Sequence, residues 1–225
     1  MNKDLKIKVC GMREPANIHA VSQMAVDFIG FIFWKGTKRN VEQLPTHAGI
    51  IPDAPSFSIN GIRQKKVGVF VDEMPQTIIT RVYNYHLDYV QLHGNESPVM
   101  INNLRRSLVP DIAPDIKIIK ALSIREADDV KRWREYEGCV NMFLFDTKCP
   151  SVGGSGTQFD WSVLSLYDGN IPFLLSGGIG PDDVESVRAF SHPMCLGIDL
   201  NSRFEDEPAL KNVERLAEFI EKIRE

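Results

Sequence analysis

The stretch that decides the fold is residues 173–183, FLLSGGIGPDD. Residues 173–176 predict a short buried strand, and the pair Gly177-Gly178 predicts a tight turn. Pro181, which two acidic residues follow, is typical of a helix start. Proline suits the first helical position, and acids favour the positive end of the helix dipole. The stretch therefore predicts one strand–turn–helix unit.

The same alternation of short apolar runs and helical segments continues in both directions along the chain, which predicts a parallel sheet with helices between its strands. We expect eight strands, at 5–10, 27–34, 66–71, 89–93, 116–121, 142–146, 173–176 and 195–199. We expect helices at 14–25, 75–84, 97–107, 124–136, 160–167, 181–190 and 208–224. Eight such units in 225 residues, with no break in composition, favour an α/β fold: a single (β/α)₈ TIM barrel over residues 1–225.

Two of the segments between strands carry unequal signals. The last helix has the clearest periodicity, through Leu210, Val213, Leu216, Ile220 and Ile223. Residues 45–61 contain three prolines and two glycines without helical periodicity, so we expect the second helix to be short, irregular, displaced or replaced by a loop. No G-x-G-x-x-G sequence joins the first strand to the first helix, which argues against a dinucleotide-binding fold.

Charge and composition limit the classes of partner. The net charge of −4 disfavours nucleic acid and anionic membranes, while a small anionic substrate stays possible. Residues 1–8 lack the apolar core of a signal peptide, and no apolar run approaches the roughly 20 residues that span a bilayer. No C-x-x-C pair occurs among the cysteines, which we expect to be reduced thiols: Cys10, Cys139, Cys149 and Cys195. We expect a soluble cytoplasmic protein, and the sequence leaves a monomer and a weak homo-oligomer both open.

A barrel carries its chemistry at the carboxyl ends of its strands. The first strand ends at Cys10, where a following glycine and a helix start favour a thiolate, although a cysteine there could instead fill space in the core. Asp146 ends an otherwise apolar strand, which is costly for an acid unless it is paired, hydrogen-bonded or used in catalysis. The alternative for Asp146 is a salt bridge to Lys148 or Lys8. Cys10 and Asp146 are thus candidates for an acid–base pair.

Other strand ends carry candidate binding groups. Gly177 and Gly178 resemble a phosphate cradle of backbone N–H groups, with a plain turn as the alternative. The loop 153–156 has the glycine-rich composition of an active-site lid, or of a surface loop. Arg39 is suited to clamp a carboxylate at the barrel mouth, unless it is a solvated turn charge. His93 has no second histidine at another strand end, so a hydrogen-bonded structural role is favoured over metal ligation.

Seven motifs occur along nearly the whole chain. They are KVCGMR at 8–13, GFIF at 30–33, VGVFV at 67–71, VQLHG at 90–94, FDTK at 145–148, GGSGT at 153–157 with FDW at 159–161, and LSGG at 175–178. In this order and combination they resemble the phosphoribosylanthranilate isomerase family of tryptophan biosynthesis. The resemblance implies a cofactor-free, metal-free Amadori rearrangement of N-(5-phosphoribosyl)anthranilate to 1-(2-carboxyphenylamino)-1-deoxyribulose 5-phosphate.

The resemblance also implies roles for individual residues. Asp146 is the general acid, which protonates the ribose ring oxygen and opens the ring to a Schiff base. Cys10 as a thiolate is the general base, which takes the C2 proton and leaves an enolamine that tautomerises to the ketone. Arg39 is the expected clamp on the anthranilate carboxylate. The expected phosphate site comprises Gly177, Gly178, Asn201 and Ser202, and the expected lid contains Gly153, Gly154 and Gly156.

The chain departs from this family in the loop 35–40, in residues 45–61, and at 201–203, where Ser-Ser-Gly becomes Asn-Ser-Arg. A side chain at Arg203 takes the place of a glycine that would leave backbone N–H groups free to approach phosphate. We expect Arg203 to turn outward and pair with Glu205 or Asp206, and a direct phosphate contact is the alternative.

Three alternative functions would each need a different set of residues. The related isomerase of histidine biosynthesis would be expected to end its first strand with an aspartate, where this chain has Cys10. A metal-dependent pentose-phosphate epimerase would need several His and Asp ligands at strand ends, and only His93 is available. A catalytically silent barrel that binds a phosphosugar would need neither Cys10 nor Asp146, so the presence of both favours an enzyme.

Overall fold

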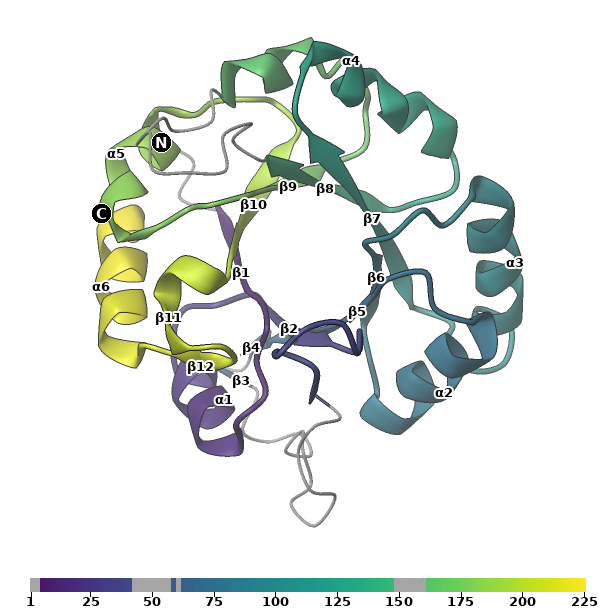
Figure 1. The fold of residues 1–225 in the computed structure, drawn as a ribbon, viewed down its shortest axis with the longest axis horizontal. Coiled ribbons are helices and arrows are strands. Elements are labelled where there is room, and N and C mark those ends of the chain that lie inside the picture. The colour runs from purple at the N-terminus through teal and green to yellow at the C-terminus, as the bar shows by residue number, and fades with distance from the viewer. Residues whose placement is uncertain (1–4, 42–57, 60–61, 148–160) are drawn as a thin grey trace.

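The computed structural model is a closed barrel of eight parallel strands with helices around it (Figure 1). It describes residues 5–41, 58–59, 62–147 and 161–225. The barrel strands are β1 (Lys6–Val9), β2 (Phe28–Ile32), β5 (Lys65–Phe70), β6 (Tyr89–Leu92), β7 (Lys117–Ile124), β8 (Met142–Thr147), β9 (Phe173–Ser176) and β10 (Cys195–Leu200). Each strand pairs with the next in sequence, and β10 closes the ring on β1. The predicted TIM barrel is confirmed.

The helical elements lie outside this ring (Figure 1). The α-helices are α1 (Pro15–Ser22), α2 (Pro75–Tyr85), α3 (Pro98–Leu108), α4 (Ala127–Val130), α5 (Val184–Ala189) and α6 (Val213–Arg224). The 3-10 helices are η3 (Lys131–Tyr136), η4 (Trp161–Leu166), η5 (Pro181–Asp183) and η6 (Ser202–Phe204). Proline opens α1, α2 and α3, where its missing N–H costs nothing because the first helical N–H groups lack intrahelical partners anyway.

Two predicted helices begin later than the sequence indicated. The segment 124–136 starts its helix at Ala127, because Ser123 and Ile124 still pair with Asp146 and Thr147 of β8. The segment 208–224 becomes helical only at Val213. Its first residues instead form β12 (Leu210–Lys211), which pairs with β11 (Glu205–Glu207), and Leu210 is exposed rather than part of the apolar face.

The structure describes only part of the segment where the second helix of the barrel would lie. Residues 58–63 include a two-stranded antiparallel hairpin, β3 (Ser58–Ile59) with β4 (Ile62–Arg63), in place of helix. This agrees with the expected loss of regular helix in 45–61. Residues 42–57 and 60–61 lie outside the described part of the chain.

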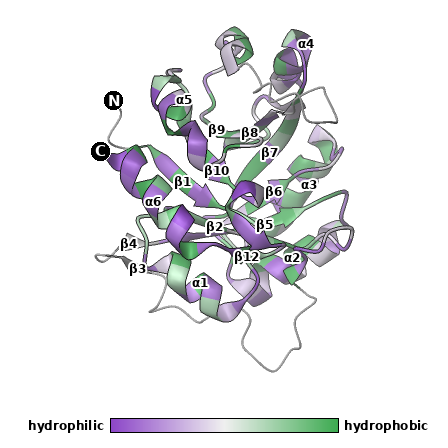
Figure 2. Cartoon of the chain, turned by 60° about the vertical axis from the view of Figure 1, so that its left-hand side comes forward, coloured by the Kyte–Doolittle hydropathy of each residue, from purple (hydrophilic) through white to green (hydrophobic). Residues whose placement is uncertain are grey.

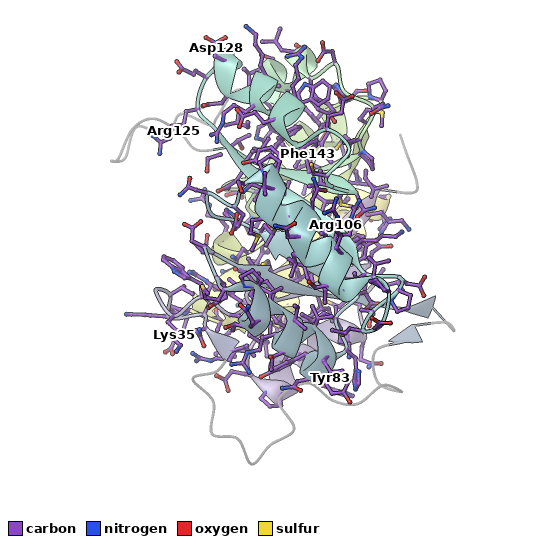
Figure 3. The ribbon with its side chains drawn as sticks, turned by 90° about the vertical axis from the view of Figure 1, so that its right-hand side faces the viewer. Lys35, Tyr83, Arg106, Arg125, Asp128 and Phe143 are labelled. Carbon is purple, nitrogen blue, oxygen red and sulfur yellow. The ribbon has the colours of Figure 1, made fainter. Side chains whose placement is uncertain are left out.

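Two layers of apolar side chains fix the barrel. Between strands and helices, Phe143 and Phe145 stack with ring centroids 5.8 Å apart. Inside the barrel, Phe28, Val67 and Tyr89 belong to a separate apolar cluster. Hydrophobic residues alternate with hydrophilic ones on the helices (Figure 2), whose outer faces carry side chains such as Tyr83 of α2 and Arg106 of α3 (Figure 3).

The interior of the barrel changes character toward the carboxyl ends of its strands. Ile7 and Val9 of β1 pack in the outer apolar layer, so Lys8 and Cys10 point into the barrel, because neighbouring strand residues face opposite sides. Asp199 of β10 lies opposite Lys8 in the strand register. The apolar interior therefore gives way to a buried polar layer at the end where a barrel places its active site.

Candidate active site

A cavity of about 180 Å³ lies at the carboxyl ends of the strands. Its walls hold both members of the predicted acid–base pair and the whole predicted phosphate site. It is lined by Cys10, Ile32, Val69, Gln91, His93, Asp146, Ser176, Gly177, Gly178, Ile179, Asp199, Asn201, Ser202 and Arg203. The topology thus brings together residues that are widely separated in sequence. The predicted lid residues Gly153, Gly154 and Gly156 lie outside the described residues, as does Cys149.

Cys10 lies among buried charges. Lys8 Nζ donates to Asp199 Oδ1 at 2.8 Å, and Ser176 Oγ donates to Asp199 Oδ2 at 3.1 Å. Burial lowers the pKa of Lys8, but Asp199 and Cys10 outweigh it and leave the pKa above its ordinary value. Burial raises the pKa of the Cys10 thiol, Lys8 lowers it, and the net direction is upward. The thiolate therefore depends on the cation beside it.

Asp146 faces a histidine across the cavity. His93 Nε2 lies 3.5 Å from Asp146 Oδ2, and Gln91 Nε2 lies 3.1 Å from His93 Nδ1. Since an amide nitrogen can only donate, Nδ1 must accept, and in the neutral ring Nε2 then carries the hydrogen that points toward Asp146. The prediction that His93 is hydrogen-bonded agrees with these contacts. The alternative pairing of Asp146 with Lys148 falls outside the described residues, and Lys8 is paired with Asp199.

The turn after β9 accepts only glycine. Gly177 has φ = 106° and Gly178 φ = 70°, the left-handed region that side chains rarely adopt. A Cβ atom on Gly177 would stand 1.9 Å from the carbonyl oxygen of Thr147. The turn therefore brings backbone without side chains to the edge of the cavity.

Arg203 does not form the predicted ion pair. Its side chain lines the cavity and packs over Gly180, where an added Cβ would meet Arg203 Nε at 3.2 Å. Its two expected partners are engaged elsewhere: Glu205 with Arg39 and Lys211, and Asp206 with Asn212. Arg203 is exposed, as expected, but the expected ion pair is not formed, because neither carboxylate bonds Arg203.

Arg39 is held in a buried ion network. Its Nε and Nη2 donate to both oxygens of Glu205, at 2.6–3.0 Å. Lys211 Nζ donates to the same carboxylate at 2.6 Å and to Asn201 Oδ1 at 2.9 Å. Burial raises the pKa of Glu205, but hydrogen bonds from Arg39 and Lys211 outweigh it, so the pKa lies below its ordinary value. Arg39 is a paired, half-buried residue rather than a solvated turn charge.

Sequence reasoning missed several members of the site. Lys8, Asp199, Glu205 and Lys211 form two of its ion pairs, and none of the four was predicted as a site residue. The alternation in β1 contained one signal, since Lys8 occupies the same face as Cys10 between apolar Ile7 and Val9. The pairing partners follow only from closure of the barrel, which places β10 beside β1.

A larger cavity, about 550 Å³, lies away from these residues. It is lined by side chains between the outer face of β9 and β10 and the helices α5 and α6, among them Leu175, Val187 and Ile223. Cys195 lines it as well, and burial raises the pKa of this thiol to about 11. Its walls also hold Arg188, Ser191 and His192, but it lies away from the carboxyl ends of the strands, where a barrel carries its chemistry.

Among the described residues, no group of three or more His, Cys, Asp or Glu side chains could hold a metal ion. Within the same ranges, every helix is too short or too polar to cross a bilayer.

The chain was compared with known families and structures. A family model described as N-(5'-phosphoribosyl)anthranilate (PRA) isomerase matches residues 7–222. The N-(5'-phosphoribosyl)anthranilate isomerase of Parabacteroides distasonis is 47% identical over 217 residues, covering 96% of this chain and 92% of that protein.

Solved structures agree. The phosphoribosyl anthranilate isomerase of Thermotoga maritima is 28% identical with a TM-score of 0.73, covering 98% of both chains. A second isomerase structure, in complex with reduced 1-(o-carboxyphenylamino)-1-deoxyribulose 5-phosphate, is 26% identical with a TM-score of 0.70 over 98% of both chains. Since the family model and the first relative both cover nearly the whole chain, this protein belongs to the phosphoribosylanthranilate isomerase family.

Proposed function

We propose that this protein isomerises N-(5'-phosphoribosyl)anthranilate in tryptophan biosynthesis, with Cys10 as general base and Asp146 as general acid. One observation carries the proposal: a thiol and a carboxyl line the same small cavity, whose rim is the glycine turn at Gly177 and Gly178. A phosphate bound at that turn would place the attached sugar between the two side chains. Family membership supports the substrate, and the cavity supports the roles of the residues.

The reaction needs one proton given and one taken. Asp146 gives its proton to the ribose ring oxygen, the bond from that oxygen to C1 breaks, and C1 becomes a Schiff base with the anthranilate nitrogen. The Cys10 thiolate then takes the proton from C2, and the resulting enolamine tautomerises to the ketone. Each such transfer by a positioned side chain typically contributes about 10²- to 10⁴-fold in rate. His93, 3.5 Å from Asp146, is placed to orient the acid.

The remaining residues would bind the two charged ends of the substrate. Arg39 is proposed to hold the anthranilate carboxylate, with its guanidinium fixed in place by Glu205. Backbone groups of Gly177 and Gly178, with Asn201 and Ser202, would hold the phosphate. The substrate is a small molecule, and the reaction in this scheme needs no cofactor. We expect the reaction to take place in the cytoplasm.

The roles of the acid and base are tested by Cys10→Ala and Asp146→Asn. Each should lower kcat by at least about two orders of magnitude, since each removes one proton-transfer group. Loss of phosphoribosylanthranilate fluorescence measures the rate, and circular dichroism checks folding. Cys195→Ala, in the larger cavity, is the matched thiol control and should keep its activity. A folded Cys10→Ala enzyme with near-normal kcat would remove Cys10 from the mechanism.

Arg203 gives a separate test of the phosphate site. Because it lines the cavity and neither Glu205 nor Asp206 bonds it, we propose that its guanidinium contacts the substrate phosphate. Arg203→Gly should raise KM by about tenfold at low salt. This corresponds to the lower end of the energy range for a hydrogen bond between charged groups. The effect should shrink as added salt screens the wild-type contact. A KM that stays within about twofold at every ionic strength returns Arg203 to the surface.

A further inference from the structure

Lys8 is an unusual residue for the inside of a barrel. Its side chain is 0% exposed, and Cys10 on the same face of β1 is 3% exposed. Lys8 Nζ lies 2.8 Å from Asp199 Oδ1, and the Cys10 thiol is close enough to raise the pKa of Lys8. Burying a lysine costs several kcal/mol of desolvation even when it is paired. Hydrophobic residues of similar volume would fill the space with less cost, so the ammonium has a role besides packing.

The charges that face Cys10 do not balance without it. Cations come from three elements: Lys8 from β1, Lys211 from β12, and Arg39 after β2. Two carboxylates pair with them: Asp199 pairs with Lys8, and Glu205 pairs with Lys211 and Arg39. Within the described part of the chain, this cluster carries one more positive than negative charge. Asp146 and His93, across the cavity, form their own pair.

We propose that Lys8 is the positioning residue that keeps Cys10 available as a thiolate, against the opposing charge of Asp199. The inference rests on the proposed role of Cys10 as the base. The thiolate would be the third anion of the cluster, and as the base its Sγ takes the C2 proton of the substrate. Lys8 keeps its own proton throughout. It touches the base rather than the reacting atoms, so its effect should appear in kcat and its pH dependence more than in KM.

The inference is tested by following the alkylation of Cys10 with iodoacetamide as a function of pH, read by mass spectrometry of the peptide. Only the thiolate reacts, so the midpoint of the rate profile reports the pKa of the thiol. In Lys8→Met the midpoint should rise by at least about one pH unit, which corresponds to about 1.4 kcal/mol. At neutral pH kcat should fall by at least about tenfold, and rising pH should restore part of it.

Lys120→Met is the matched control. Lys120 is likewise a fully buried lysine with a carboxylate partner, Glu96, and it lies outside the cluster around Cys10. Its loss should leave the Cys10 midpoint unchanged. If Lys8→Met does not fold, Asp199→Asn tests the same cluster, and the midpoint for Cys10 should then shift in the opposite direction. The Asp199 carboxylate raises the pKa of Cys10, so its removal should lower the midpoint.

The outcomes separate the two proposals. A midpoint that does not move in Lys8→Met, or that moves upward in Asp199→Asn, overturns the role of Lys8. If the wild-type enzyme keeps full activity after Cys10 has been alkylated, Cys10 is not the base, and the proposed mechanism fails together with the inference. A raised midpoint in Lys8→Met, together with loss of activity on alkylation, supports both.

Discussion

Two buried lysines lie on opposite faces of the barrel wall, and their pKa values are shifted in opposite directions. Lys8 points into the barrel and contacts Asp199 at 2.8 Å, while Lys120 of β7 points outward and contacts Glu96 at 3.0 Å. Both are at most 1% exposed. Yet the pKa of Lys8 lies above its ordinary value and the pKa of Lys120 lies below it.

The difference lies in what surrounds each ammonium. Burial is the largest influence on the pKa of both lysines and lowers it in both. Lys8 has a carboxylate and a thiol beside it, and together they outweigh burial. Lys120 has one carboxylate, two backbone carbonyls and the face of Tyr136, and the positive charge of Arg132 opposes it. Two lysines that are equally inaccessible to solvent therefore have pKa values shifted in opposite directions, because the charged groups around them differ.

The two pairs also differ in what they hold. Lys120 bonds the carbonyls of Leu92 and Gly94, and Glu96 accepts the backbone N–H groups of Asp72 and Gly94. That pair ties together the loops that follow β5 and β6. Among the described groups, Lys8 and Asp199 bond each other and Ser176, and Cys10 is the thiol that influences the pKa of Lys8. We infer that the outer pair serves stability and the inner pair serves the reaction.

The largest expected effect is on stability, in Lys120→Met. This change leaves the Glu96 carboxylate buried without its cation, and it should lower the free energy of unfolding by about 3–5 kcal/mol. Urea denaturation measures the loss, and kcat should stay within about twofold at a temperature where the variant is folded. Lys8→Met should lose a similar stability but also most of its activity. Equal kcat losses in the two variants would contradict the division of roles.

The sequence predicted the barrel because strand and helix signals are local. The strand at 173–176 coincides with β9, since a turn of two glycines and a proline-started helix bound it on one side. Strand β7 ran past its predicted end at 121 because pairing with β8 continues through Ile124, which no local pattern reveals. Residues 45–61 gave no helical signal, and their described part, Ser58–Ile59, is strand β3, which pairs with β4.

The candidate site was predictable where a strand end alone marks it. Cys10, Asp146 and Gly177 follow from that rule, and all three line the cavity. The pair of Lys8 with Asp199 was not predictable, because its members are 191 residues apart and meet only when the barrel closes. The ion pair expected for Arg203 was wrong for a related reason. Proximity in sequence suggested Glu205, but Arg39, which is 166 residues from Glu205, bonds it instead.

A smaller effect is expected from the hydroxyl that supports the inner pair. Ser176 Oγ donates to the second oxygen of Asp199, so Ser176→Ala should cost about 1.5–3 kcal/mol, the range for a hydrogen bond to a charged group. Thermal or urea unfolding measures it. Thr80→Ala, which removes an exposed hydroxyl bonded to a backbone carbonyl in α2, is the control and should stay within about 0.5 kcal/mol. A loss as small as that of the control would show that Asp199 needs no second donor.

The smallest effect is a change of slope with pH, and it tests the opposite titration directly. For Lys120 the folded pKa lies below the unfolded value near 10.5, so between these two values the unfolded chain binds more protons and stability rises with pH. For Lys8 the folded pKa lies above 10.5, so its contribution is present below 10.5 and is lost as pH rises through the folded pKa. As pH rises from the folded pKa toward 10.5, the stability of the wild type relative to Lys120→Met should therefore increase, by at most about 1.4 kcal/mol per pH unit. Taking the difference cancels the tyrosines and cysteines that titrate in both proteins. A difference that stays flat or falls over this range would mean that Lys120 keeps its proton as firmly as Lys8 does, and that the contrast between the two faces of the wall does not exist.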